Sequence, residues 1–306
     1  SGAPSLAVTE SSQRLAAWLR ENSTVPLSDV SHTLMAGRHG FEHRRVLAAA
    51  SHDEAARLLE SGDARRVFTH VLELDRPSVV FMYPGGGAQY FQMARTLYDR
   101  EPVFREQMDQ GLDKLRTKFK ADLRSIFFPQ PESRDATIAS LAQPSIQLPL
   151  IFVIEYALTT LLRHYGVIPT ALIGHSMGEN AAACVAGVFN FFDALGLVLL
   201  RGQLMDEVPE GGMLSVSMPA AELSQRLGPD LDLATSNSPQ LSVASGPMPL
   251  IDALAAKLRA EGIDSQKVRI NIAAHSRMLD GILDRFRAYL KSIRLNEPKI
   301  PIVSNR

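Results

Sequence analysis

The residue best placed to do chemistry is Ser176, in the pattern Gly174-His175-Ser176-Met177-Gly178. The apolar run 171–173 before it predicts a buried strand, and the small residues 181–186 after it predict a tightly packed helix. A strand, a sharp turn and a helix lift a serine hydroxyl to the end of a sheet, beside the free N–H groups of a helix N-terminus. A chance match in a loop is the alternative, but the flanking strand and helix favour a serine nucleophile.

A serine hydroxyl near neutral pH needs a base, and two of the eight histidines are candidates. His175 adjoins Ser176, but neighbours on a tight turn point in different directions, so we expect His175 to line the site instead. His275 follows the small apolar residues 272–274, and a neutral imidazole in such surroundings can act as a base. The spacing alone supports equally well a loop histidine that caps the next helix.

Composition narrows the class of protein. The 306 residues are 45% apolar and 21% charged, which is ordinary for a globular enzyme, and the net charge of -1 gives no reason to expect binding to nucleic acid or an acidic membrane. The single cysteine, Cys184, rules out an intramolecular disulfide, so we expect it in the core and the protein in a reducing cytoplasm. The longest apolar run, 148–162, is interrupted by Glu155, so we expect no membrane span.

The first unit expected along the chain is a small α+β module over residues 1–76. We expect helices at 13–19, from Leu27 to Gly37 with Ser28 as the N-cap, and at 51–59 with Ser51 as the N-cap. Strands are expected at 44–50 and 67–74.

A second unit, an α/β core, is expected over 77–208 and 272–306. The continuous apolar run 78–83 predicts a strand of a parallel sheet that is covered on both faces. It leads into the glycine-rich turn 84–89, which lacks a nucleotide-binding pattern but can bring a backbone N–H close to a reacting carbonyl. Further elements are expected as helices at 90–97, 102–119, 143–165, 192–205 and 278–293, and as a strand at 300–304.

The segment 209–271 has a pattern of its own and interrupts this core. Alternating apolar residues predict strands at 212–218, 231–235, 241–245 and 266–270, with helices at 219–227 and 249–261. The order βαββαβ is typical of a ferredoxin-like subdomain.

Six short motifs then occur together in one order. They are Pro84-Gly-Gly-Gly-Ala-Gln89, Gln143-Pro144, Gly174-His-Ser-Met-Gly-Glu179, Arg201-Gly-Gln-Leu-Met205, Asn237-Ser-Pro239 and Ala274-His-Ser276. In this order the chain resembles malonyl-CoA:acyl carrier protein transacylases, and most of all the acyltransferase domains of modular type I polyketide synthases. Leu34-Met-Ala-Gly-Arg38 and Phe41-Glu-His-Arg44 resemble the linker that precedes such domains, after a ketosynthase. The resemblance implies an α/β-hydrolase-like core with a parallel sheet and an inserted ferredoxin-like subdomain.

The resemblance also implies roles for single residues. Ser176 and His275 form a nucleophile and base pair that works by a ping-pong mechanism through an acyl-serine, and backbone N–H groups of Met177 and Gly86 form the oxyanion hole. Arg201 binds the free carboxylate of the acyl group, a task that suits a planar guanidinium. Without the resemblance, Arg201 would be interpreted as a helix arginine in a surface ion pair. The other expected substrate contacts are Gln143, His175, Asn237, Met177, Ile272 and Ala274.

The implied substrates are an acyl-CoA and a phosphopantetheinylated acyl carrier protein, with no bound cofactor. The histidines show no metal-ligand spacing, so we expect no metal. The implied partners are the carrier protein and the adjacent ketosynthase domain, with no nucleic acid and no membrane. A serine hydrolase of the α/β-hydrolase type and a non-catalytic docking unit are alternatives.

The chain departs from the family pattern in ways that bear on the choice of substrate. Gly86 stands where the family usually has glutamine, and family members continue beyond the equivalent of Arg306, which leaves the group that orients His275 unassigned. Glu179 is expected to complement the helix dipole and not to complete a triad. Met177 favours malonyl, whereas the small Ala274 leaves room for the methyl branch of methylmalonyl; we favour malonyl.

Overall fold

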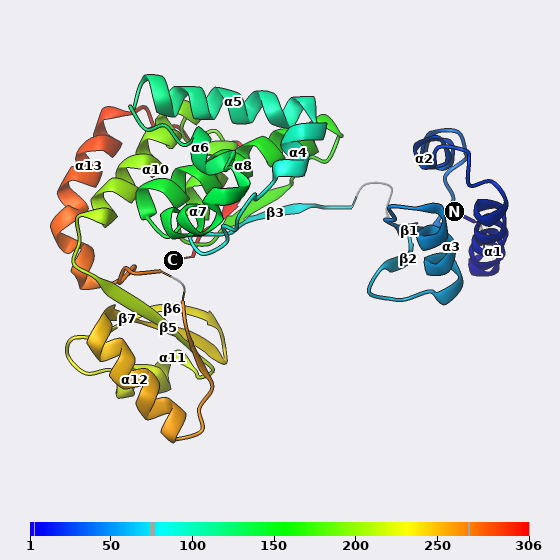
Figure 1. Ribbon diagram of the computed structural model, residues 1–306. Helices are drawn as coiled ribbons and strands as arrows, with labels where there is room; N and C mark the ends of the chain where they lie inside the picture. The colour runs from blue at the N-terminus through cyan, green and yellow to red at the C-terminus, as the bar shows by residue number, and fades with distance from the viewer. Residues whose placement is uncertain (3, 74–76, 269, 306) are drawn as a thin grey trace. The chain divides into compact units, whose positions relative to one another are not determined.

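The computed structural model describes residues 1–2, 4–73, 77–268 and 270–305. The chain divides into two compact units, Ser1–Pro77 and Ser78–Arg306 (Figure 1), and the predicted boundary lies one residue away. Each unit is described by itself.

The first unit packs helices against a two-stranded antiparallel sheet. Its elements are α1 Ser5–Glu21, α2 Leu27–Ala36, β1 His43–Leu47, α3 His52–Ser61 and β2 Val67–Val71. The predicted cap of α3 is confirmed, because the Ser51 hydroxyl accepts a hydrogen bond from the Glu54 N–H at 3.2 Å. The predicted cap of α2 is wrong: Pro26 is the N-cap, and Ser28 lies inside the helix. The strand predicted over 67–74 ends at Val71, and its last residue, Leu74, lies outside the described part of the chain.

The second unit is built on a parallel sheet of three described strands in the order β3-β4-β9, as predicted for the core. These are β3 Val80–Tyr83, β4 Ala171–Gly174 and β9 Ile302–Val303. Because Tyr83 is paired with Gly174, the glycine-rich turn and the serine turn leave the sheet at the same edge. Parallel α/β sheets bind ligands at this edge, beyond the carboxyl ends of their strands.

Helices surround this sheet (Figure 1). They are α4 Arg95–Arg100, α5 Pro102–Thr117, α6 Arg124–Phe127, α7 Arg134–Ser140, α8 Pro144–His164, α9 Gly178–Val185, α10 Phe191–Asp206 and α13 Leu283–Ser292, with 3-10 turns at Pro131–Ser133 and Arg277–Ile282. The helix predicted at 90–97 begins only at Arg95, because Gln92 and Ala94 have positive φ angles, which a helix excludes. The helix predicted at 278–293 is split, since its first part forms the 3-10 turn, which contains the poor helix former Gly281.

Helix α8 is the central helix of the core. By length and composition alone it could cross a membrane, but 67% of its most apolar 18-residue window is buried inside the protein, as in the core helix of a globular domain. Phe152 is fully buried, and its ring stacks on Phe191 of α10 at 5.7 Å between centroids. The same helix buries the carboxyl group of Glu155, to which no described group hydrogen-bonds.

The inserted subdomain has the predicted βαββαβ order of elements. They are β5 Gly211–Val216, α11 Ala220–Arg226, β6 Asp232–Ser238, β7 Leu241–Pro247, α12 Met248–Ala260 and β8 Ser265–Lys267, in an antiparallel sheet of order β6-β7-β5-β8. One face of the sheet, with Leu214 and Ala244, forms an apolar core with residues of α11 and α12. The strand predicted to reach Ile270 ends at Lys267, and Arg269 lies outside the described residues.

Candidate active site

The sharp turn predicted at Ser176 is present, and its backbone is strained. Ser176 has a φ of 52°, between the end of β4 and the first residue of α9. A Cβ on Gly174 would collide with the backbone of Gly178, and one on Gly178 would collide with the Tyr83 carbonyl oxygen. Both glycines are therefore required for the serine to stand at the edge of the sheet.

The glycine-rich turn after β3 lies against the serine. A Cβ on Gly85 would be 2.7 Å from the His175 carbonyl oxygen and 3.2 Å from the Ser176 Cβ, so only a glycine allows this approach. No described group accepts a hydrogen bond from the backbone N–H of either Gly86 or Met177. Two free donors beside a nucleophile can stabilise an oxyanion.

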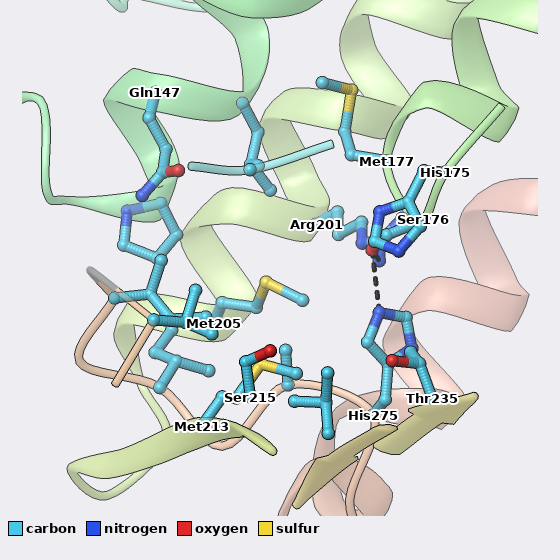
Figure 2. Close-up of a pocket in the computed structure, with 18 of the residues that line it drawn as sticks. Gln147, His175, Ser176, Met177, Arg201, Met205, Met213, Ser215, Thr235 and His275 are labelled. Carbon is cyan, nitrogen blue, oxygen red and sulfur yellow. Dashed lines mark hydrogen bonds between the residues drawn. The ribbon is translucent and has the colours of Figure 1, made fainter. Parts of the chain in front are cut away.

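The structure brings Ser176 and His275 together. His275 Nε2 lies 2.7 Å from Ser176 Oγ across 99 residues of sequence (Figure 2). The competing interpretation of His275 as the cap of the next helix is wrong, because the side chain of Ser276 is the cap and accepts a hydrogen bond from the Met278 N–H.

The surroundings of His275 favour its neutral form. Burial lowers the pKa of the imidazole below its ordinary value of 6.5, and the positive charge of Arg201 lowers it further, as does His175, while Glu179 acts in the opposite direction. An imidazole that is neutral near pH 7 can take the serine proton. The residue itself has a positive φ of 58°, so a strained backbone aims it at the serine.

Arg201 of α10 is the cation of the site. Its Nη2 donates to Ser176 Oγ at 3.3 Å, and its Nη1 donates to Asn180 Oδ1 at 3.2 Å. None of the described carboxylates forms an ion pair with this guanidinium. Burial lowers the pKa of Arg201, whereas the charge of Glu179 raises it. A part-buried cation without a carboxylate partner beside a nucleophile is suited to bind a carboxylate on a substrate.

These groups open onto a cavity of about 230 Å³ between the core and the inserted subdomain. Core residues and the sheet of the subdomain both line it, as Figure 2 shows. Of the predicted site residues, the cavity wall includes Gly86, His175, Ser176, Met177, Arg201, Asn237, Ile272, Ala274 and His275. His175 Nε2 lies 3.4 Å from Asn237 Oδ1, so these two residues connect the core to the subdomain at the cavity.

One predicted contact needs correction, and a second, Met177, lines the cavity with its side chain packed in the core. Gln143 is not among the residues that line the cavity; it is the N-cap of α8, and Gln147, one turn further along that helix, lines the cavity instead. The side chain of Met177 is 1% exposed and belongs to the core cluster, and Figure 2 shows it running away from the Ser176–His275 hydrogen bond.

Apart from Asn237, the sequence prediction missed the subdomain strands' share of the cavity wall. Met213, Ser215, Thr235 and Val243, from β5, β6 and β7, line it together with Met205 of α10. Alternation along β5 signals this face, because Leu214 and Val216 are buried in the subdomain core. Within the described part of the chain, no cluster of three or more histidine, cysteine or acidic side chains could hold a metal ion.

Comparison with known proteins gives matches over both units. Residues 80–306 match the family model described as "Acyl transferase domain". Residues 3–59 match the model described as "CurL-like, PKS C-terminal".

Individual relatives agree with the first of these matches. The chain is 35% identical, over 98% of its length, to a phenolphthiocerol/phthiocerol polyketide synthase of Mycobacterium tuberculosis, and it covers 20% of that relative's length. Among solved structures, the acyl transferase domain of ZmaA has a TM-score of 0.87 at 35% identity, covering 100% of this chain and 71% of that one. The acyl transferase domain of SpnD, solved in complex with 2-(pent-4-yn-1-yl)malonyl, has a TM-score of 0.83 at 34% identity, covering 100% and 72%.

Proposed function

The chain belongs to the acyl transferase domains of modular type I polyketide synthases, and on this premise we propose that it transfers a malonyl-type extender unit. The unit passes from CoA to Ser176 and then to the phosphopantetheine thiol of an acyl carrier protein. The observation that carries this proposal is the arrangement around Ser176 Oγ, with His275 Nε2 at 2.7 Å and Arg201 Nη2 at 3.3 Å.

In the first half-reaction, His275 Nε2 takes the proton of Ser176 while Oγ attacks the thioester carbonyl carbon. The carbon–sulfur bond then breaks, and the CoA sulfur leaves with the proton that His275 had taken. The N–H groups of Gly86 and Met177 stabilise the negative oxygen of the tetrahedral intermediate. The product is an acyl-serine ester.

The second half-reaction runs the same chemistry in reverse. The carrier-protein thiol gives its proton to His275, and its sulfur attacks the ester carbonyl of the acyl-serine. The bond to Ser176 Oγ breaks, and the serine recovers the proton from the imidazole. One thioester replaces another, so no oxidant, metal or cofactor is consumed.

Arg201 selects the class of acyl group. A malonyl carboxylate can accept two parallel hydrogen bonds from the guanidinium. An acetyl group would leave the cation without a partner, and a buried unpaired charge is costly. The guanidinium thereby also holds the acyl group still during attack.

We favour malonyl over methylmalonyl as the extender. Two buried polar atoms at the cavity, Gln147 Oε1 and Thr235 Oγ1, lack a described hydrogen-bond partner. A methyl branch against them would keep water from bonding to them. Methylmalonyl is the second candidate, because Ala274 is small and lines the cavity. The Met177 side chain packs in the core cluster, so its main proposed role is that of its backbone N–H.

The wider setting is proposed on the same grounds. Homologous proteins are multidomain polyketide synthases, so we expect a carrier protein and an adjacent ketosynthase domain as partners, with the first unit as the linker and a cytoplasmic location. The core is proposed to be α/β-hydrolase-like and the inserted subdomain ferredoxin-like, in keeping with its strand order.

A mass measurement tests the proposal. The chain is incubated with malonyl-CoA, methylmalonyl-CoA and acetyl-CoA, and the intact protein is weighed before and after addition of a phosphopantetheinylated carrier protein. We expect a malonyl adduct that Ser176→Ala abolishes and that moves to the carrier protein. Faster labelling by methylmalonyl-CoA would overturn the choice of malonyl, and rapid loss of the adduct to water would favour a hydrolase.

A further inference from the structure

The cavity presents hydrogen-bonding atoms that the described protein groups leave unused. On the core side, Gln147 is 2% exposed, and no described group hydrogen-bonds to its Oε1. On the subdomain side, the same holds for the buried Oγ1 of Thr235. Buried polar atoms in native proteins nearly always have a partner, so both atoms point to a polar ligand group or water in the cavity.

The orientation of the Gln147 amide is fixed by its other end. Its Nε2 donates to the Ala142 carbonyl oxygen at 3.1 Å, and the reverse orientation would set two oxygens against each other. The atom that faces the cavity is therefore a hydrogen-bond acceptor, and Figure 2 shows it directed inward. It seeks an O–H or N–H donor.

Gln147 also lies beside the glycine turn that approaches the nucleophile. A Cβ on Gly86 would be 3.0 Å from Gln147 Oε1, and a Cβ on Gly85 would be 3.2 Å from the Cβ of Ser176. The glycine turn therefore connects the serine to the Gln147 oxygen. With its carbonyl oxygen bound by the Gly86 N–H, as proposed above, we expect the adjacent carbon of the acyl group to lie towards this acceptor.

Thr235 faces the cavity because of a β-bulge. In β6, Leu233 pairs with Ala244 and Thr235 with Val243, so Ala234 is an extra residue. Because of the bulge, Thr235 lies with Val243 on the face of the sheet that lines the cavity, and not with Ala244 on the buried face.

The bulge completes a polar row across the sheet. Val243 also pairs with Ser215 of β5, so two hydroxyl groups flank Val243 on the cavity wall. No described group hydrogen-bonds to the Ser215 hydroxyl, and both side chains are visible in Figure 2. Hydroxyl groups can donate and accept, so this row complements a small polar substituent.

From these placements we infer that the site takes a malonyl thioester that carries a hydroxyl group on the carbon between its two carbonyls, an inference that rests on the proposed function. The hydroxyl can donate to Gln147 Oε1 or bond to the Thr235–Ser215 row. An ammonium group at this carbon is disfavoured, because it would add a positive charge near the cation of Arg201. A methyl group of the same size would leave the polar atoms without partners.

The test compares three CoA thioesters that differ only at this carbon: malonyl, hydroxymalonyl and methylmalonyl. The rate of Ser176 acylation is followed by intact mass on the full chain. We expect hydroxymalonyl to acylate at least about tenfold faster than methylmalonyl, because a site with hydrogen-bonding groups rejects an isostere that lacks them. Equal rates, or faster methylmalonyl, would overturn the inference.

Variants show which residues cause the preference for hydroxymalonyl over methylmalonyl. Thr235→Val keeps the shape and removes the hydroxyl, and Gln147→Met removes the acceptor; each is expected to reduce the hydroxymalonyl-to-methylmalonyl ratio several-fold. Ser245→Ala is the matched control, because Ser245 Oγ is also buried without a described partner but the residue does not line the cavity; its ratio should stay unchanged.

The possible outcomes of this experiment distinguish a failure of the inference from a failure of the function on which it rests. If Thr235→Val lowers the rate of Ser176 acylation equally with all three thioesters, the Thr235 hydroxyl contacts the pantetheine arm, and the inference is overturned. If malonyl-CoA labels Ser176 but hydroxymalonyl has no advantage over methylmalonyl, only the inference fails. If no thioester labels Ser176, the proposed function fails as well.

Discussion

The two walls of the cavity use their polar atoms in different ways. On the core wall, the polar groups at the nucleophile bond to one another, as Arg201 does to Ser176 and Asn180. Away from the nucleophile, Gln147 Oε1 on the core wall and Thr235 Oγ1 on the subdomain wall have no described partner. A connected network fixes reacting atoms, whereas unpartnered groups are available to a ligand. The core around Ser176 is therefore suited to chemistry, and the subdomain sheet, together with Gln147 of the core, is suited to selection. His275 lies on the segment that joins the two walls.

The largest expected effect that tests this comparison is on the core wall. Arg201→Ala should lower the rate of Ser176 acylation by malonyl-CoA by about 100-fold, because the acyl carboxylate loses its partner. The rate with acetyl-CoA should change far less. Arg201→Lys keeps the charge and loses the planar guanidinium, so its rate with malonyl-CoA should lie between those of the wild type and Arg201→Ala. An equal loss with both thioesters would mean that Arg201 acts only by positioning Ser176.

Next in size is the pH dependence of His275. His275 must be neutral to accept the proton. Burial is the main cause that lowers its pKa, and the charges of Arg201 and His175 lower it further. We expect malonyl transfer to lose activity only below pH 6.5, the ordinary value for histidine, by about tenfold per pH unit. In Arg201→Ala, measured with acetyl-CoA beside the wild type, the midpoint should move to higher pH. A wild-type midpoint above 6.5 would contradict the geometry.

Stability offers a third test, which concerns the core alone. Burial raises the pKa of Glu155 to about 9, from an ordinary 4.5. Between these values the folded state binds more protons than the unfolded state, so stability falls as pH rises, by up to about 1.4 kcal/mol per pH unit. In Glu155→Gln this dependence should disappear.

Urea unfolding at pH 6 and pH 8 provides the measurement. The wild type should lose more stability than Glu155→Gln between the two conditions, while Glu106→Gln, which changes an exposed carboxyl on α5, should follow the wild type. Parallel losses in all three proteins would show that Glu155 does not titrate in this range.

The sequence predicted the core wall better than the subdomain wall, for a physical reason. The turn at Ser176 depends on residues within one short segment, where Gly174 and Gly178 are visible in the sequence. Thr235 reaches the cavity through the bulge at Ala234, which simple alternation along a strand cannot reveal. Gln147 was missed because the choice between it and Gln143 depends on which turn of α8 approaches the glycine loop.

The smallest expected effect concerns the segment that joins the two walls. Arg277, two residues after His275, donates from its side chain to both carboxylate oxygens of Asp232 on β6, at 2.7 to 3.2 Å, and its backbone N–H donates to the same carboxylate at 2.9 Å. His275 has a positive φ, and such strain persists only when neighbouring structure holds it. We therefore expect Asp232 to act as a positioning residue for the base.

Asp232→Asn should lower kcat by about two- to fivefold and leave the KM for malonyl-CoA unchanged, since an exposed ion pair contributes little and only the aim of the imidazole is affected. Asp252→Asn is the matched control: it removes another ion pair of the subdomain, with Lys267, away from His275. If Asp232 merely stabilised the subdomain, both variants would lower the melting temperature alike and neither would change kcat. A kcat effect confined to Asp232→Asn would instead show that the selecting wall also aims the base, so the division between chemistry and selection is not complete.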